Sequence, residues 1–235
     1  MSHLHIPDGV LPLAWILLGF ILTGLGLGVS VLSLARRDRA RVVPRIAILS
    51  AIMILAMGLP IPVLNYHVNL TVLTGILAGP AEGFIAVFIT NLFLALTAHG
   101  GITVLGLNTI VTGLEVVVGW ALWRAFSRAI RRPFAAAAVT TILALAVSTT
   151  AMLGIVRASQ VNPSLLLHHH HESEEAHIPE NEDLADEDHH DEGSFSTFAK
   201  VVYTAGAVGW VLEAVVVGSV TQFIAKARPE MLKEA

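Results

Sequence analysis

The 235-residue sequence contains no cysteine, and only 14% of its residues are charged. The absence of cysteine excludes disulfides, thiolate metal sites, iron–sulfur clusters and cysteine nucleophiles. The shortage of charge matters more, because 54% of the residues are hydrophobic and a soluble domain of this composition would expose large apolar patches. A lipid bilayer is the solvent in which such a chain is stable. The sequence therefore predicts an integral membrane protein.

Several catalytic motifs are missing as well. The sequence has no His-Glu-x-x-His metalloprotease motif, no Gly-x-Ser-x-Gly nucleophile motif and no Gly-x-x-x-x-Gly-Lys-Ser/Thr phosphate-binding loop. It also lacks a basic surface suited to nucleic acid. We therefore expect a protein that is not an enzyme, and any ATP hydrolysis that drives it must occur in another chain.

Hydrophobic residues are concentrated in long runs. One run, 68–97, is interrupted by Gly79-Pro80, and because proline costs about 3 kcal/mol inside a helix, we expect two helices there, the first of them short. Only helices or closed barrels satisfy the backbone in lipid, and the runs lack the alternation of barrel strands. We predict an all-α polytopic membrane bundle of six or seven transmembrane helices, with residues 1–235 forming a single integral membrane domain. The apolar segments are 10–35, 46–59, 68–78, 80–97, 105–126, 134–156 and 198–225.

Positive charges indicate how the helices are oriented. Twelve of the fourteen lysine and arginine residues lie in three places, namely 36–45, 124–132 and 226–233. Because cytoplasmic loops are enriched in Lys and Arg, all three are expected in the cytoplasm. Threading seven segments alternately through the membrane agrees with this assignment. It predicts a multi-pass protein of the cell membrane with its N-terminus outside and its C-terminus in the cytoplasm.

All eleven histidines fall on the outer side in this topology. They lie in or beside the expected outer loops 1–9, 60–67, 98–104 and 158–197. Histidine is the commonest metal ligand, so its one-sided distribution indicates an outer face that handles metal ions. The residues are His3, His5, His67, His99, His168, His169, His170, His171, His177, His189 and His190.

Segment 168–192 is a low-complexity stretch that contains seven of these histidines and eleven acidic residues. Such a composition cannot bury apolar surface, so we predict a disordered extracellular loop. Many weak ligands without a fixed geometry suit an antenna that concentrates ions rather than a selective site. The alternative is an inert hydrophilic linker.

The N-terminal sequence Met1-Ser2-His3-Leu4-His5 places two histidines close to a free amine. A terminal amine, a deprotonated backbone amide and an imidazole can supply three nitrogens in one plane, which suits Ni(II) or Cu(II). If Met1 is retained, His3 is the third residue and can close the plane. If Met1 is removed, Ser2 supplies the amine and a fourth ligand must come from elsewhere. The alternative is a frayed terminus with solvated histidines.

Two further histidines are candidate ligands. His67 follows Pro60 and Pro62, which end the preceding helix, and it opens the next helix near the membrane boundary. A neutral imidazole there could complete a metal site, or it could simply be an interfacial histidine at a helix start. His99 precedes Gly100-Gly101 and is either an outer-face ligand or a solvent-facing loop residue.

Five polar side chains lie within the predicted spans and should face the bundle interior, because they are costly in lipid. Glu115 and Glu213 could act as proton-relay groups in a secondary carrier, or they could form hydrogen bonds between helices. The five residues are Glu82, Asn91, Asn108, Glu115 and Glu213.

Several motifs occur along most of the chain in a defined order and spacing. They are His5-Ile6-Pro7-Asp8-Gly9, Pro60-Ile61-Pro62 with His67, the stretches 75–80 and 100–108, the last helix with Glu213, and the ending 227–232. Together they resemble the CbiM/NikM family, the substrate-binding components of energy-coupling factor (ECF) transporters for cobalt and nickel.

The resemblance implies a nearly planar set of nitrogens around the ion. In the family these come from the terminal amine, the amide and imidazole of the second residue, and a histidine after the second helix. His67 matches the last of these, and His5 matches the N-terminal histidine. This sequence departs from the pattern, because three residues, Met1 to His3, precede the expected start at Leu4. Either Leu4 or His5 supplies the amide instead, or His3 takes over after Met1 is removed.

The resemblance also implies partners: a transmembrane coupling subunit and ATPase subunits, often with a small accessory membrane protein. We therefore predict a substrate-specific component for uptake of Co²⁺ or Ni²⁺, without a resident cofactor. Both ions accept imidazole nitrogens, so the residues do not distinguish them. The alternative is a secondary carrier or channel for a divalent metal cation that uses the intramembrane glutamates. The predicted metal ligands are His67, His5, His3, Ser2 and Met1.

Overall fold

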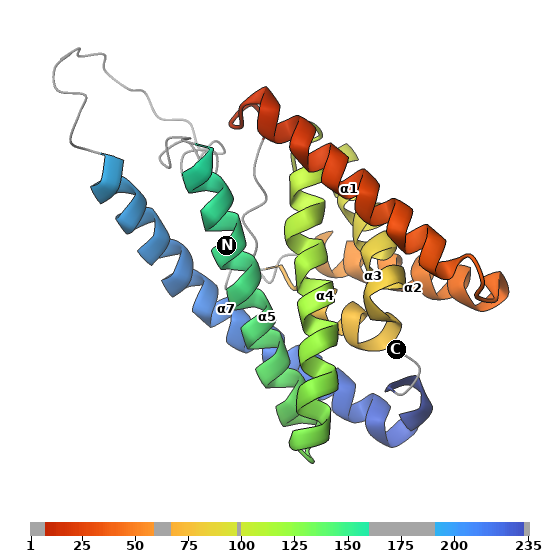
Figure 1. Cartoon of the computed structure of the whole chain (residues 1–235). Coiled ribbons are helices and arrows are strands. Elements are labelled where there is room, and N and C mark those ends of the chain that lie inside the picture. Colours follow the sequence, from red (N-terminus) through yellow and green to blue (C-terminus); the bar gives the residue numbers. More distant parts are fainter. Residues whose placement is uncertain (1–7, 59–66, 98–99, 160–190, 233–235) are drawn as a thin grey trace, which may run out of the picture.

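The computed structural model describes residues 8–58, 67–97, 100–159 and 191–232 (Figure 1). All regular structure in these ranges is helical, which confirms the predicted all-α class. The predicted ligands Met1, Ser2, His3 and His5 lie outside the described residues, as does His99. So does segment 168–192, except that the last helix takes in its final two residues. The elements are α1 (Leu13–Leu34), α2 (Arg39–Gly58), α3 (Thr71–Leu96), α4 (Leu105–Ala129), α5 (Pro133–Ala158), α7 (Asp191–Ala227) and the short 3₁₀ helix η1 (Pro229–Leu232).

The part of the chain that the structure describes contains six helices that are long and apolar enough to cross a membrane. Their outward faces carry large apolar side chains, most clearly on α1, where Leu13, Leu25 and Leu32 are 69%, 62% and 76% exposed. Such a surface is stable against hydrocarbon and would be costly in water. The chain is therefore a multi-pass membrane protein.

Helix α3 is divided, as the sequence predicted. Gly79 has a φ of 75° and a ψ of −179°, a conformation that glycine adopts without strain, and Pro80 follows it. The first part, residues 71–78, rises about 12 Å at about 1.5 Å per residue. That length is too short to cross about 30 Å of hydrocarbon. The predicted short helix is thus present as the first part of a broken helix and does not form a span of its own.

The buried core has two clusters that lie toward opposite ends of the bundle. Four helices, α1, α4, α5 and α7, each contact the larger cluster near one end and the smaller cluster near the other. We call the end of the larger cluster the basic end, since the connections α1–α2 and α4–α5 and the end of α7 lie there (Figure 1). The three basic stretches of the sequence are therefore gathered at one end. The larger cluster includes Leu34, Trp123, Ala136 and Val217; the smaller includes Leu11, Val104, Val156 and Phe198.

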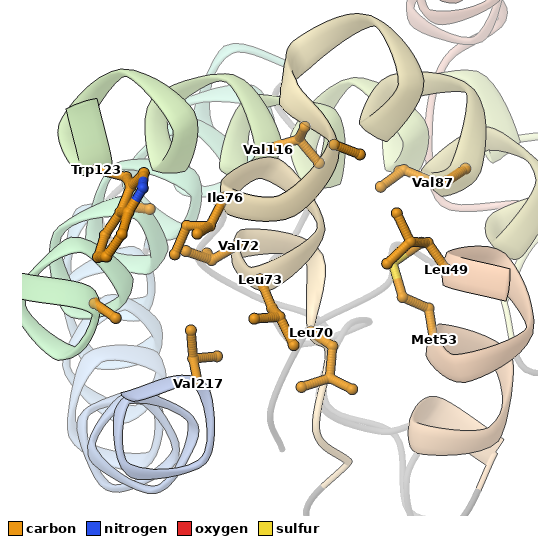
Figure 2. Close-up of a cluster of buried hydrophobic side chains, with 14 of the residues drawn as sticks. Leu49, Met53, Leu70, Val72, Leu73, Ile76, Val87, Val116, Trp123 and Val217 are labelled. Atoms are coloured by element: carbon orange, nitrogen blue, oxygen red, sulfur yellow. The ribbon is translucent and has the colours of Figure 1, made fainter. Parts of the chain in front are cut away.

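The first part of α3 packs at the centre of the larger cluster. Figure 2 shows Val72, Leu73 and Ile76 on α3 between Leu49 of α2, Val116 of α4 and Val217 of α7. The contact with α4 is close, because a Cβ added at Gly75 would overlap the carbonyl oxygen of Val116. Glycine at this position lets the two backbones approach. The approach brings Glu115, the neighbour of Val116, next to the start of α3.

Candidate metal-binding site

His67 is the predicted ligand that the structure describes, and it opens a short non-helical stretch, residues 67–70, before α3. Its side chain is partly buried. In residues 8–58, 67–97, 100–159 and 191–232, no group of three or more His, Asp or Glu side chains is arranged to hold a metal ion. A site at His67 built from three such side chains would therefore take ligands from outside these ranges.

The backbone of this stretch is strained at its last residue. Leu70 has a φ of 60°, and among the described residues it is the one non-glycine residue with a positive φ. A residue with a Cβ pays about 1–3 kcal/mol for such a conformation and keeps it only where the surroundings enforce it. Leu70 is itself buried, and its carbonyl oxygen accepts hydrogen bonds from the Thr74 amide at 3.0 Å and the Thr74 hydroxyl at 3.1 Å. These contacts fix one side of the strained residue.

Two buried carboxylates fix the stretch from the other side. The amide nitrogen of Leu70 donates to Oε1 of Glu213 on α7 at 3.2 Å. Asn69 Nδ2 donates to Oε2 of Glu115 on α4 at 2.6 Å, and the Thr71 hydroxyl donates to the same oxygen. Ser148 on α5 donates to the second oxygen of Glu115 at 2.7 Å. We call Glu115 and Glu213 the carboxylate clamp, because together they tie residues 69–71 to three helices.

The clamp residues are inside the bundle, as the sequence predicted. Glu115 is 1% exposed and Glu213 is fully buried. Of the two roles considered for them, the observed bonds of Glu115 match hydrogen bonding between helices. The sequence signal was the cost of a carboxylate in lipid, which indicates an interior position but not its partners. The positioning of the His67 stretch by Glu115 and Glu213 was therefore missed.

Asp8 anchors the chain just after the N-terminal segment. Its carboxylate accepts hydrogen bonds from the Ile102 amide at 3.0 Å, the Thr103 amide at 2.8 Å and the Thr103 hydroxyl at 2.5 Å. A Cβ at Gly101 would lie 2.5 Å from Oδ1 of Asp8, so only glycine leaves room for this contact. Burial by itself would raise the pKa of Asp8, but the hydrogen bonds from Thr103, Ile102 and Val104 outweigh it and lower the pKa below 3.8. Asp8 was not predicted as a site residue, although it lies in the His5–Gly9 motif.

Glu82 is the third interior glutamate, and it serves another part of the fold. Its carboxylate lies 3.4 Å from Nη1 of Arg37 and 3.7 Å from Nε of Arg45. Both arginines belong to the basic stretch 36–45, so these ion pairs tie the α1–α2 connection and the first part of α2 to α3. The described partners of Glu82 are thus in the basic stretch 36–45, whereas those of Glu115 and Glu213 include residues 69–71.

The family profile described as "Cobalt uptake substrate-specific transmembrane region" (CbiM) matches residues 5–231. The chain belongs to the CbiM family. A protein of Methanococcus voltae that carries the name of a cobalt transport protein, CbiM, is 32% identical to this chain over 129 residues. The matched residues are 52% of this chain and 58% of that protein. The cobalt transport protein CbiM of Geobacter sulfurreducens is 31% identical over 133 residues, which are 53% of this chain and 38% of the relative. The matches with these CbiM relatives thus span 58% and 38% of the relatives' lengths.

Solved structures share the CbiM fold seen here. A transition metal transporter superposes with a TM-score of 0.71 at 20% identity, over 95% of this chain and 93% of that chain. A truncated transition metal transporter gives a TM-score of 0.71 at 19% identity, over 95% and 99% of the two chains. At this level of identity the likeness establishes the arrangement of helices in this CbiM family member, and its ligands must be argued from its own residues.

Proposed function

We propose that the chain is the substrate-specific membrane component of an ECF-type transporter that takes up Co²⁺ or Ni²⁺, with the ion held by N-terminal nitrogens and His67. The observation that carries the proposal is the position of His67, which begins a strained interior stretch held by buried hydrogen bonds. A constrained backbone of this kind is typical of functional segments. Imidazole and amine nitrogens suit both Co²⁺ and Ni²⁺.

The N-terminal segment is the source of the remaining ligands in this proposal. Asp8 ties the chain to residues 102–103 beside α4, and at most about 3.5 Å of reach is added by each of residues 7 to 1. Met1, Ser2, His3 and His5 supply the amine, amide and imidazole donors, with His3 and His5 as alternative imidazoles. The donor set is then mostly nitrogen, which favours a transition metal over Mg²⁺ or Ca²⁺.

The basic end supports the proposed orientation. Because Lys and Arg are retained on the cytoplasmic side, the gathering of stretches 36–45, 124–132 and 226–232 at one end supports a cytoplasmic position for that end. The N-terminal segment then faces the outside, where the ion arrives. Helix α5 ends and α7 begins toward that side, and segment 168–192 between them would concentrate cations there.

The partners proposed are a transmembrane coupling subunit and ATPase subunits, with a small accessory membrane protein. The support is the resemblance to ECF components together with a sequence that has no phosphate-binding loop. Energy for uptake would then come from ATP hydrolysed in another chain.

Calorimetric titration of the purified full chain with Ni²⁺ and Co²⁺ tests the site. His67→Ala should weaken binding by more than the roughly 10–100-fold typical of a lost outer-shell partner. One of His3→Ala and His5→Ala should show a comparable loss, and the other should bind normally. His99→Ala is the matched control, and wild-type affinity is expected. Unchanged binding in His67→Ala would refute the proposed site.

A secondary carrier remains the second candidate, because Glu115 and Glu213 are carboxylates buried in the bundle interior. This function predicts metal uptake by proteoliposomes that contain the purified chain alone and are driven by a proton or voltage gradient. The ECF proposal predicts uptake only when ATPase and coupling subunits are also present. The two reconstitutions separate the candidates.

A further inference from the structure

The stretch that carries His67 is held by two carboxylates that no comparison assigns to a site. We propose that Glu115 and Glu213 are positioning residues, which fix the backbone of residues 67–71 and thereby set the direction of the His67 imidazole. The inference rests on the proposed role of His67 as a metal ligand. It assigns the clamp a part in metal affinity, beyond a general contribution to stability.

Glu115 is bound in a way that limits its own movement. Its Oε2 accepts from Asn69 and Thr71, and its Oε1 accepts from Ser148 on α5 at 2.7 Å. Rotation of the carboxylate would break bonds to α5 and to the His67 stretch at once. Asn69 is fully buried, so the lost bonds could not be replaced by water without opening the bundle. The side chain therefore acts as a fixed strut between α4, α5 and the start of α3.

Glu213 acts at the strained residue itself. It accepts from the Leu70 amide at 3.2 Å, and Leu70 is three residues after His67. A left-handed leucine reverts to an ordinary conformation if the contacts that enforce it are removed. Such a reversal would redirect the chain on its N-terminal side, which is the side of His67. The strained backbone at Leu70 and the carboxylate clamp thus indicate the same role, which is to hold the His67 stretch in a single conformation.

The three described donors to Glu115, on Asn69, Thr71 and Ser148, are neutral groups, so a neutral acceptor can replace the carboxylate and geometry can be separated from charge. In Glu115→Gln, one amide oxygen can still accept from Asn69 and Thr71. Ser148 has a second acceptor within reach, the Val111 carbonyl oxygen at 3.3 Å, so the new amide group can be accommodated. A positioning role therefore predicts that glutamine rescues binding, and a direct effect of the negative charge predicts that it does not.

The test measures Ni²⁺ affinity, the absorption spectrum of bound Ni²⁺ and the melting temperature of the purified full chain. Because outer-shell changes cost about 10–100-fold in affinity, Glu115→Ala should lose that much and shift the ligand-field bands, whereas Glu115→Gln should stay within about threefold of wild type. Glu213→Gln, which keeps an acceptor for Leu70, should behave like Glu115→Gln. Glu82→Ala is the matched control: it removes a buried carboxylate that pairs with Arg37 and Arg45 instead of residues 69–71, so only the melting temperature should fall.

Four results overturn the inference. Wild-type affinity and spectrum in Glu115→Ala, with His67→Ala defective, would reject the clamp and leave the metal site standing. A loss in Glu115→Gln equal to that in Glu115→Ala would assign the effect to charge. An equal loss of Ni²⁺ affinity in Glu82→Ala would show that the effect of Glu115→Ala comes from lowered stability alone. Wild-type affinity in His67→Ala would reject the site and the inference together. If Glu115→Ala does not fold, Asn69→Leu decides, because it removes the Asn69–Glu115 bond at similar side-chain volume and should still weaken binding and shift the spectrum.

Discussion

The hydrogen bonds between Asp8 and residues 102–103 allow a quantitative prediction about metal binding. Asp8→Ala removes three hydrogen bonds, two of them from backbone amides just before α4. Asp8 is exposed, so the loss should resemble that of a helix-capping aspartate, about 1–2 kcal/mol. If the N-terminal segment supplies ligands, the variant must hold this segment in place without the Asp8 bonds when the ion binds. The lost bond energy then reduces the free energy of binding. Since 1.4 kcal/mol corresponds to tenfold, the Kd for Ni²⁺ should rise about 5- to 30-fold.

Asp38 provides the matched control for this prediction. It is also an exposed aspartate that accepts a hydrogen bond from a backbone amide, that of Ala40 at 3.0 Å, and it lies at the start of α2 at the basic end. Asp38→Ala should lower the melting temperature to a similar degree and leave the Kd unchanged. Calorimetric titration of both variants decides the matter. The reasoning fails if Asp8→Ala binds as wild type does, or if Asp38→Ala weakens binding equally.

Three further predictions follow from the same structure. Hydrogen bonds lower the pKa of Asp8 below 3.8, so the stability that the Asp8 carboxylate adds is present above about pH 4 and is lost as the pH falls through the lowered pKa. The difference in melting temperature between wild type and Asp8→Asn should therefore vanish below that pKa. A difference that stays constant with pH would contradict this. Gly75→Val should lower the melting temperature by several degrees, because even a Cβ there overlaps the Val116 carbonyl oxygen and overpacking costs about 1–3 kcal/mol. Gly24 has open space around it, so Gly24→Val should have little effect. Deletion of 172–192 should reduce uptake in cells only when metal is scarce, and complete loss of uptake would exclude the antenna role.

Local sequence patterns were sufficient to predict the helices and their breaks. The length of each apolar run sets the spans, Gly79-Pro80 sets the break in α3, and the positive charges mark the stretches that the fold brings to one end. These features depend on residues close together in the chain and on the preference of side chains for lipid or water. The six-or-seven count was left open because a run of apolar residues does not show how far a short helix extends through the bundle.

The candidate site was predictable only in part, because its contacts join distant parts of the chain. Glu115 and Glu213 were expected inside the bundle, but their bonds to Asn69 and Leu70 depend on how α4 and α7 pack against α3. The positive φ of Leu70 carries no sequence signal, since leucine seldom adopts it. Asp8 has an ordinary sequence context too, and its partner loop is almost a hundred residues away.

The place of Glu115 along α4 has an electrical consequence. Glu115 is ten residues beyond Leu105, or about 15 Å along the helix, and its bonds to Asn69 and Thr71 put the His67 stretch near that depth. If an ion from the outside is captured there, as proposed, it has already crossed part of the membrane voltage. For a doubly charged ion that crosses half of a 100 mV potential, the gain is about 2.3 kcal/mol. A cell that keeps its interior negative would thus load this protein more fully than the same protein in detergent.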